Sequence, residues 1–181
     1  MNSDAVHESA MAGDVDGLAA ALSAAARLGE GSVLTELNSH GWSPLHCASI
    51  AGDKQAVDML LTAGAKINAK SSQAEETPLH FAAAWDHREV VNTLLSRGAF
   101  LEETNHAGST ALHKACEYGA ENAVAELLQR GVITLYVEHR RFRPRFNFQV
   151  EQGDIENISV EFAQQGVAEP VKKGWQIANR H

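Results

Sequence analysis

The tetrapeptide Thr77-Pro78-Leu79-His80 decides the fold of this chain, because near copies of it lie before and after it along the sequence. One copy is Ser43-Pro44-Leu45-His46 and another is Thr110-Ala111-Leu112-His113, so the histidines stand 34 and 33 residues apart. Each copy is followed at the same steps by a leucine pair and a glycine: Leu60-Leu61 and Gly64, Leu94-Leu95 and Gly98, Leu127-Leu128 and Gly131. Three landmarks that keep one phase indicate an internal structural repeat.

The first half of each unit predicts a short helix. Thr77 has a hydroxyl that suits an N-cap, and Pro78 suits the first helical position, where a missing backbone N–H is no loss. Ala82 and Ala83 follow, and their small side chains let a neighbouring helix approach closely.

The second half predicts a turn and an outer helix. Asp86 occupies the position of Gly52 and Gly119, and both residue types tolerate a left-handed backbone. The valines at 90–91 and the leucines at 94–95 then form the apolar stripe of a helix. Because each helix pair keeps a bare apolar flank, the units must stack on one another.

This pattern resembles the ankyrin repeat, whose Thr-Pro-Leu-His-x-Ala signature and period near 33 it matches over roughly residues 5–131. The resemblance implies a mainly α fold, a solenoid of helix-turn-helix units with hairpin-like loops. Val6-His7 and Gly13 fit a first unit that carries six additional residues before the next one. We therefore expect an ankyrin-repeat region over residues 1–133, with units at 5–37 (a cap), 38–70, 71–104 and 105–133.

After Gly131 the apolar pattern changes to a period of two, which predicts strands over 133–137, 146–150 and 158–162 and a weaker one at 175–177. We expect residues 134–181 to form a short C-terminal β-rich segment. Two interpretations stay open: the segment covers the end of the stack, or it is a tail, since three strands without a second layer are marginal.

The β-rich segment contains the basic cluster Arg140, Arg141, Arg143 and Arg145. Such a cluster can bind nucleic acid or anionic lipid, or act as a nuclear import signal. A solvated loop between strands is the interpretation we favour, because one basic loop on an acidic protein is a weak nucleic-acid footprint.

The composition describes a soluble chain. Hydrophobic residues make up 44% and charged residues 21% of the 181 residues, and no apolar run approaches a membrane span. We expect a cytoplasmic protein, with a nuclear location if the arginine cluster is an import signal, because no secretory signal is evident and only two cysteines occur. The net charge of −8 suits a basic partner and disfavours nucleic acid.

The residues that invite a chemical interpretation have structural explanations. The resemblance implies that the motif histidines bond to backbone and to the neighbouring threonine hydroxyl; they are His7, His46, His80 and His113. Cys47 and Cys116 lie two units apart, so a disulfide between them is not expected. No catalytic or metal-ligand motif is evident, and we expect no enzyme activity, no metal and no cofactor.

In ankyrin-repeat proteins the binding surface is typically the concave face, made of loop tips and the solvent side of the inner helices. Carried over unit by unit, the resemblance assigns partner binding to His40, Trp42, Ile50, Glu76, Trp85, His106, Ser109, Glu117 and Tyr118. Trp85 and Tyr118 align with each other, and large aromatic residues dominate interface energetics. Trp42 and Trp85 have a second interpretation, which is packing across adjacent units.

These observations predict a non-catalytic protein–protein interaction module, a scaffold or adaptor. Two alternatives are nucleic-acid or anionic-lipid binding through residues 140–145, and a regulatory subunit or fragment of a larger enzyme. The loop before Thr77 departs from the repeat, because it has one additional residue and no tip glycine.

Overall fold

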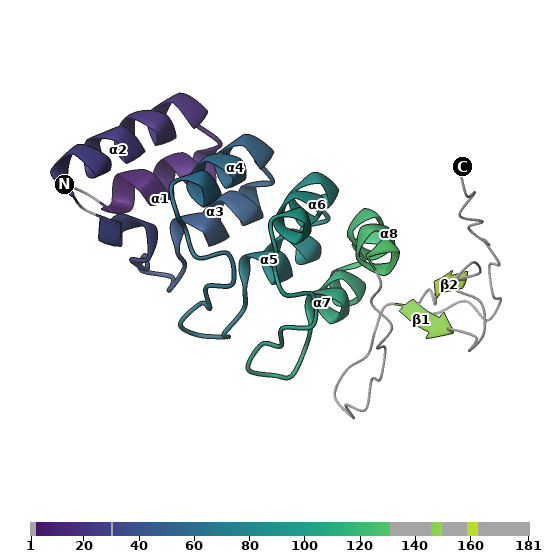
Figure 1. Cartoon of the computed structure of the whole chain (residues 1–181). Helices are drawn as coiled ribbons and strands as arrows, with labels where there is room; N and C mark the ends of the chain where they lie inside the picture. Colours follow the sequence, from purple (N-terminus) through teal and green to yellow (C-terminus); the bar gives the residue numbers. More distant parts are fainter. Residues whose placement is uncertain (1–2, 30, 131–145, 150–158, 163–181) are drawn as a thin grey trace.

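The computed structural model describes residues 3–29, 31–130, 146–149 and 159–162, and the described part is mainly helical (Figure 1). Four helix pairs follow one another along the chain: α1 Ser3–Ala12 with α2 Val15–Leu28, α3 Pro44–Ala51 with α4 Lys54–Thr62, α5 Pro78–Ala84 with α6 Arg88–Ser96, and α7 Ala111–Tyr118 with α8 Glu121–Gln129. A 3-10 turn, η1 Gly31–Leu34, follows the first pair. The longer α2 and η1 take up additional residues of the first unit.

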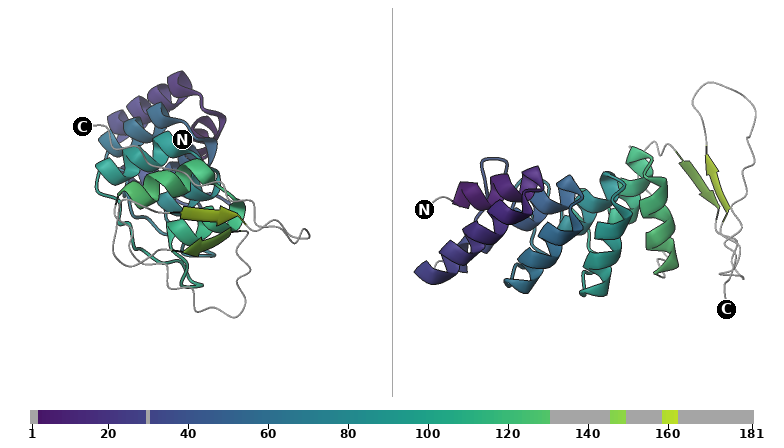
Figure 2. Two further views of the ribbon diagram at one scale, coloured as in Figure 1. Left: turned by 90° about the vertical axis from the view of Figure 1, so that its right-hand side faces the viewer. Right: turned by 90° about the horizontal axis from the view of Figure 1, so that it is seen from above.

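The helix pairs stack side by side in two rows (Figure 2). The inner row contains α1, α3, α5 and α7, each packed on the next, and the outer row contains α2, α4, α6 and α8. This is the helical solenoid that the repeat predicts. No helix of the described residues is long and apolar enough to cross a membrane.

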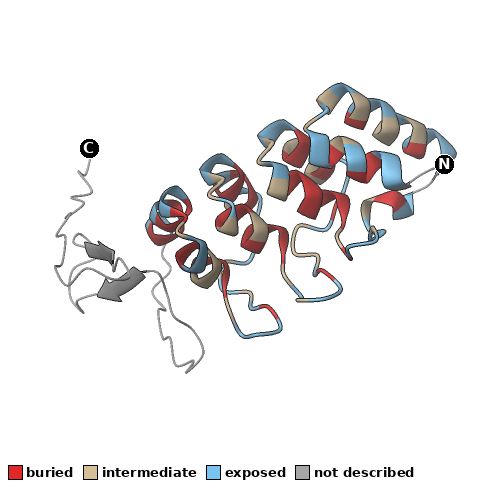
Figure 3. Ribbon diagram, turned by 180° about the vertical axis from the view of Figure 1, so that it is seen from behind, coloured by how far each residue is buried: buried red, intermediate tan, exposed pale blue. Residues whose placement is uncertain are grey.

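The core runs between the two rows, as the buried residues in Figure 3 show. Leu79, Ala82 and Ala83 of α5 are fully or almost fully buried, and so are Val91 and Leu94 of α6. The alanines let the rows approach, and the branched residues fill the space between neighbouring pairs. Burial of one such branched side chain stabilises the fold by about 2 kcal/mol.

Two of the motif histidines, His46 and His80, join their units to the next ones. The backbone N–H of Thr77 donates to Nδ1 of His80 at 3.2 Å, so Nε2 carries the proton and donates to the carbonyl of Ser109 at 2.9 Å. His46 bonds in the same way to Ser43 and to the carbonyl of Glu76. The structural role predicted for these histidines is confirmed.

Left-handed residues form the turns between paired helices. Asp86 has a φ of 60°, beside 77° for Gly52 and 76° for Gly119, as predicted from its phase. In the loop before α5, Glu75 has a φ of 54° at the position where Gly41 and Gly108 stand in the other loops. The loop that lacks a glycine therefore keeps the left-handed turn, at a cost in strain that Glu75 bears.

Two short strands are described near the C-terminus. β1 Phe146–Gln149 pairs antiparallel with β2 Ser159–Phe162, with Phe146 opposite Phe162. The strands predicted at 133–137 and 175–177 lie outside the described residues.

Candidate interaction surface

Trp85 and Tyr118 stand at equivalent ends of two neighbouring inner helices. Trp85 is the C-cap of α5 and Tyr118 is the last residue of α7, and these two helices pack against each other. The exposed fractions are 60% for Trp85 and 57% for Tyr118. The fold does not need either ring in its core, so both are free to contact another molecule.

Lys114 organises the charges beside Tyr118. Its Nζ lies 3.1 Å from Glu76 and 3.4 Å from Glu117, and 4.9 Å from the centre of the Tyr118 ring. Burial acts to lower the pKa of Lys114, but Glu76 and Glu117 raise it overall, so the ammonium group stays charged. Glu76 also accepts a hydrogen bond from Asn105 at 3.3 Å, so its carboxylate is largely engaged within the protein.

Trp42 packs across adjacent units. Its ring stacks on His40 at a centroid distance of 4.9 Å and meets the edge of Phe81, on α5 of the next unit, at 5.6 Å. Trp42 is half-buried against the core, whereas Trp85 is exposed. The packing interpretation therefore describes Trp42, and the exposed aromatic pair is Trp85 with Tyr118.

The other predicted positions fall into two groups. Some have exposed side chains, and others are half-buried residues whose backbone accepts hydrogen bonds from a neighbouring unit. His40, His106 and Glu117 are exposed. Ile50 is half-buried, and its carbonyl accepts a hydrogen bond from His87 Nε2 at 2.8 Å. Ser109 is half-buried, and its carbonyl accepts the bond from His80.

A second lysine links two loop tips. Lys70 Nζ lies 2.9 Å from Glu103 and 3.4 Å from Glu75, and all three side chains are partly exposed. Lys70, Glu103 and Lys114 were missed by sequence reasoning. For Lys114 the sequence did contain a signal. Lys114 directly follows a motif histidine, as Phe81 and Cys47 do in the other units, and it is the charged residue among these three.

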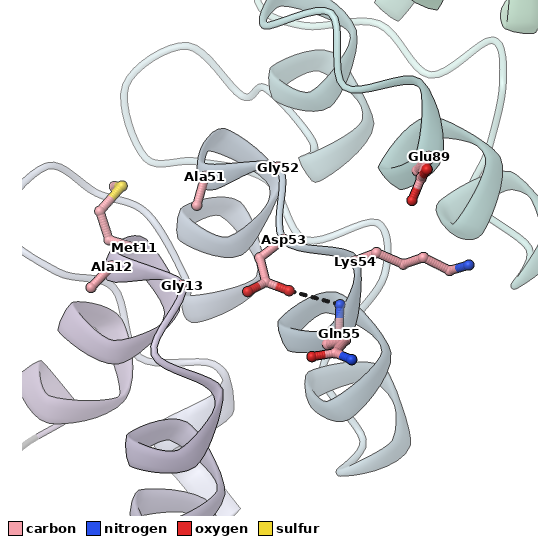
Figure 4. Close-up of a pocket in the computed structure, with 9 residues that line it drawn as sticks. All are labelled: Met11, Ala12, Gly13, Ala51, Gly52, Asp53, Lys54, Gln55 and Glu89. Atoms are coloured by element: carbon pink, nitrogen blue, oxygen red, sulfur yellow. Dashed lines mark hydrogen bonds between the residues drawn. The ribbon is translucent and has the colours of Figure 1, made fainter.

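A shallow hollow of about 580 Å³ lies along the turns of the first two units and reaches Glu89 on α6 of the third (Figure 4). Its lining comes from Met11, Ala12, Gly13, Ala51, Gly52, Asp53, Lys54, Gln55 and Glu89. Asp53 accepts hydrogen bonds from the backbone of Gln55 at 2.8 Å and Ala56 at 3.0 Å, which caps α4. The hollow is open and polar, and its lining includes Ala51, the last residue of α3.

The described residues offer little reactive chemistry. Burial raises the pKa of Cys47 to about 11 and that of Cys116 further, so both thiols stay protonated and unreactive near neutral pH. Both cysteines are free. Within the described part no cluster of three His, Cys, Asp or Glu residues could hold a metal ion. The cluster Arg140, Arg141, Arg143 and Arg145 lies outside the described residues.

Comparison with known proteins gives the family. The ankyrin repeat model matches residues 40–72, and the model for three copies of ankyrin repeats matches residues 69–136, which together cover more than half of the chain. The putative ankyrin repeat protein FPV031 of fowlpox virus is 41% identical over 88 residues, 49% of this chain and 26% of that protein. Human ankyrin repeat and SOCS box protein 16 is 34% identical over 125 residues, 64% of this chain and 27% of that protein.

Human inversin is 33% identical over 88 residues, 49% of this chain and 8% of that protein. The chain thus spans about a quarter or less of the length of these relatives. The family models, the helix pairs and the motif histidines agree with one another, and the chain belongs to the ankyrin-repeat family.

Proposed function

We propose that this protein is a non-catalytic interaction module that binds a protein partner through Trp85 and Tyr118 on the concave side of the repeats. Ankyrin repeats generally mediate protein–protein interaction, and the family is generally not enzymatic. The observation that carries the proposal is the pair of aromatic side chains, each more than half exposed, at equivalent ends of α5 and α7.

The expected loss of affinity when these rings are removed follows from what such rings contribute once a partner covers them. Tryptophan and tyrosine are enriched among the residues whose truncation costs an interface about 2 kcal/mol or more. Their ring systems lose little conformational freedom on binding, because each has only two rotatable side-chain bonds.

Two groups of charges, one beside Tyr118 and one at the loop tips, favour a basic partner. Lys114 is shared by Glu76 and Glu117, and Lys70 is shared by Glu75 and Glu103, so each group keeps a net negative charge. Partly exposed charges at the rim of an interface mainly accelerate association and add little to affinity. We therefore expect a basic partner to associate more slowly as salt is added.

A capture experiment with a matched control tests the proposal. The native chain, the double variant Trp85→Ala, Tyr118→Ala and the control Phe100→Ala are each immobilised and exposed to cell extract. Phe100 is 61% exposed and lies in the loop after α6, so the control removes an equally exposed ring from a different place. Captured proteins are identified by mass spectrometry, and circular dichroism checks that all three forms are folded.

We expect a partner that the native chain and the Phe100 control capture, and that the double variant binds at least about tenfold more weakly. If the double variant captures the same partners equally well, the concave aromatic pair is not the binding site. Substitution of the four arginines between 140 and 145 then tests the phosphate-binding alternative, whose affinity falls steeply with salt.

A further inference from the structure

Within the four helix pairs that the structure describes, Asp86 is the one residue at the turn between paired helices that is not glycine. The equivalent positions hold Gly13, Gly52 and Gly119, all at positive φ, and Asp86 adopts the same left-handed conformation with a φ of 60°. Aspartate reaches this conformation less readily than glycine does. If the turn were the only requirement at this position, glycine would serve it better.

The carboxylate of Asp86 contacts the helix of the next unit. Its Oδ1 accepts a hydrogen bond from the backbone N–H of Ala123 at 2.8 Å, and its Oδ2 accepts one from Nδ2 of Asn122 at 2.7 Å. Both donors lie in the first turn of α8, where backbone N–H groups have no partner within the helix.

α8 has no side-chain cap of its own. Its N-cap residue is Ala120, whereas α2 is capped by Asp14 and α4 by Asp53 from the same unit. Asp86 therefore supplies the cap of α8 from the preceding unit.

This cap joins the two turns that carry the exposed aromatic residues. Trp85 directly precedes Asp86, and Tyr118 lies two residues before Ala120, the N-cap of α8. On the opposite side, His87 donates to the carbonyl of Ile50 at 2.8 Å, which ties the same turn to the preceding unit. The segment that carries Trp85 is thus held by both neighbours.

We propose that Asp86 is a positioning residue that sets Trp85 relative to Tyr118 by capping α8 across the unit boundary. The part of this inference that concerns binding rests on the proposed function of the aromatic pair. A surface whose two rings are held in place before binding loses less conformational freedom when a partner docks, which increases affinity.

Two substitutions separate the effect of the cap on the position of Trp85 from the requirement for a left-handed backbone at residue 86. Asp86→Gly keeps the left-handed turn and removes the cap. Asp86→Asn keeps an oxygen that can accept from Ala123 and tolerates the left-handed backbone. Asp14→Ala is the control, because it removes the cap of α2, which lies two units away from Trp85.

Two readouts need no partner. Hydrogen exchange of the Ala123 amide reports the cap, and the ¹⁹F NMR signal of 5-fluorotryptophan at position 85, assigned with Trp85→Phe, reports the position of the ring. We expect Asp86→Gly to lower the protection of the Ala123 amide about tenfold and to shift or broaden the Trp85 signal. Asp86→Asn and Asp14→Ala should leave the Trp85 signal as in the native chain.

The third readout is affinity for the partner captured by the native chain. We expect Asp86→Gly to weaken it about fivefold, and Asp86→Asn to leave it near the native value. A native Trp85 signal in Asp86→Gly would overturn the inference. Failure of the proposed function would show separately, as unchanged capture by the Trp85→Ala, Tyr118→Ala variant.

Discussion

His46 and His80 are buried at the boundaries between units, with both ring nitrogens engaged in hydrogen bonds. Burial lowers the pKa of both imidazoles, to about 4 for His46, because the charged form would lose its hydration. The backbone N–H that donates to Nδ1 leaves no place for a second proton there. These histidines therefore hold the units together only while they are neutral.

The first prediction concerns the stability of the fold below neutral pH. The folded pKa of His46, about 4, lies below the ordinary 6.5, so the unfolded chain binds more protons between these values. Stability is therefore lost as the pH falls through this window, and His46 alone contributes about 2 kcal/mol of loss between pH 7 and pH 5. Urea unfolding followed by circular dichroism measures the free energy of unfolding at both pH values.

The variants His46→Gln and His106→Gln complete this test. His106 is exposed, so its variant should keep the full pH dependence, whereas His46→Gln should lose a large part of it. Equal pH dependence in all three proteins would contradict the assigned role of His46.

At the residue scale, sequence reasoning succeeded where the reason for a residue is local. The roles of Thr77 and Pro78 follow from positions within one helical turn, and the structure shows both at the start of α5 as expected. The role of His80 came from the ankyrin resemblance, and its bond to the carbonyl of Ser109 spans 29 residues. The left-handed backbone of Asp86 followed from its phase with glycines. The partners of its carboxylate did not, because they lie 36 and 37 residues away.

At the scale of elements, α6 and α8 are joined by a buried carboxylate. Glu126 is 4% exposed and accepts from Nε of Arg88 at 3.0 Å, Nδ2 of Asn92 at 2.7 Å and Nε of Arg130 at 3.4 Å. Burial acts to raise the pKa of Glu126, but these hydrogen bonds and the charge of Arg88 lower it overall. Its contribution to stability is thus present above the ordinary carboxyl pKa of 4.5 and is lost as the pH falls below it.

The second prediction is that Glu126→Gln destabilises the fold by about 1–2 kcal/mol, because the amide loses the charge that two arginines share. Arg88 and Arg130 are partly exposed and can regain water, which keeps the loss below that of a fully buried pair. Thermal unfolding at pH 7 measures the effect. Glu121→Gln, at the exposed start of α8, is the control and should change stability by less than about 0.5 kcal/mol.

Sequence reasoning did not identify this cluster. Glu126 is in phase with Met59 and Thr93, so the repeat itself does not require a carboxylate there. Only the packing of α6 against α8 brings Arg88 and Asn92 to it.

At the scale of the whole molecule, the stack of four helix pairs has two ends that need a polar or covered face. Whether the C-terminal segment, 134–181, covers an end of the stack or is a tail stays a prediction, because most of the segment lies outside the described residues. The third prediction is that a chain ending at Ile133 melts several degrees lower than the full chain or loses solubility, because the last unit would expose its flank. Differential scanning calorimetry of both chains checks this, and an identical melting transition would show that the segment is not a cap.

The sequence by itself determined the repeat, the order of helices and turns, and the positions at which Trp85 and Tyr118 stand. These features follow from short motifs that recur at a fixed period, so each is specified within a single unit. The tertiary structure alone decided that Asp86 caps α8, that Lys114 neutralises Glu76, and that Trp42 packs on the next unit. Each of these contacts crosses a unit boundary, and its geometry depends on how the units stack, which no local pattern of residues records.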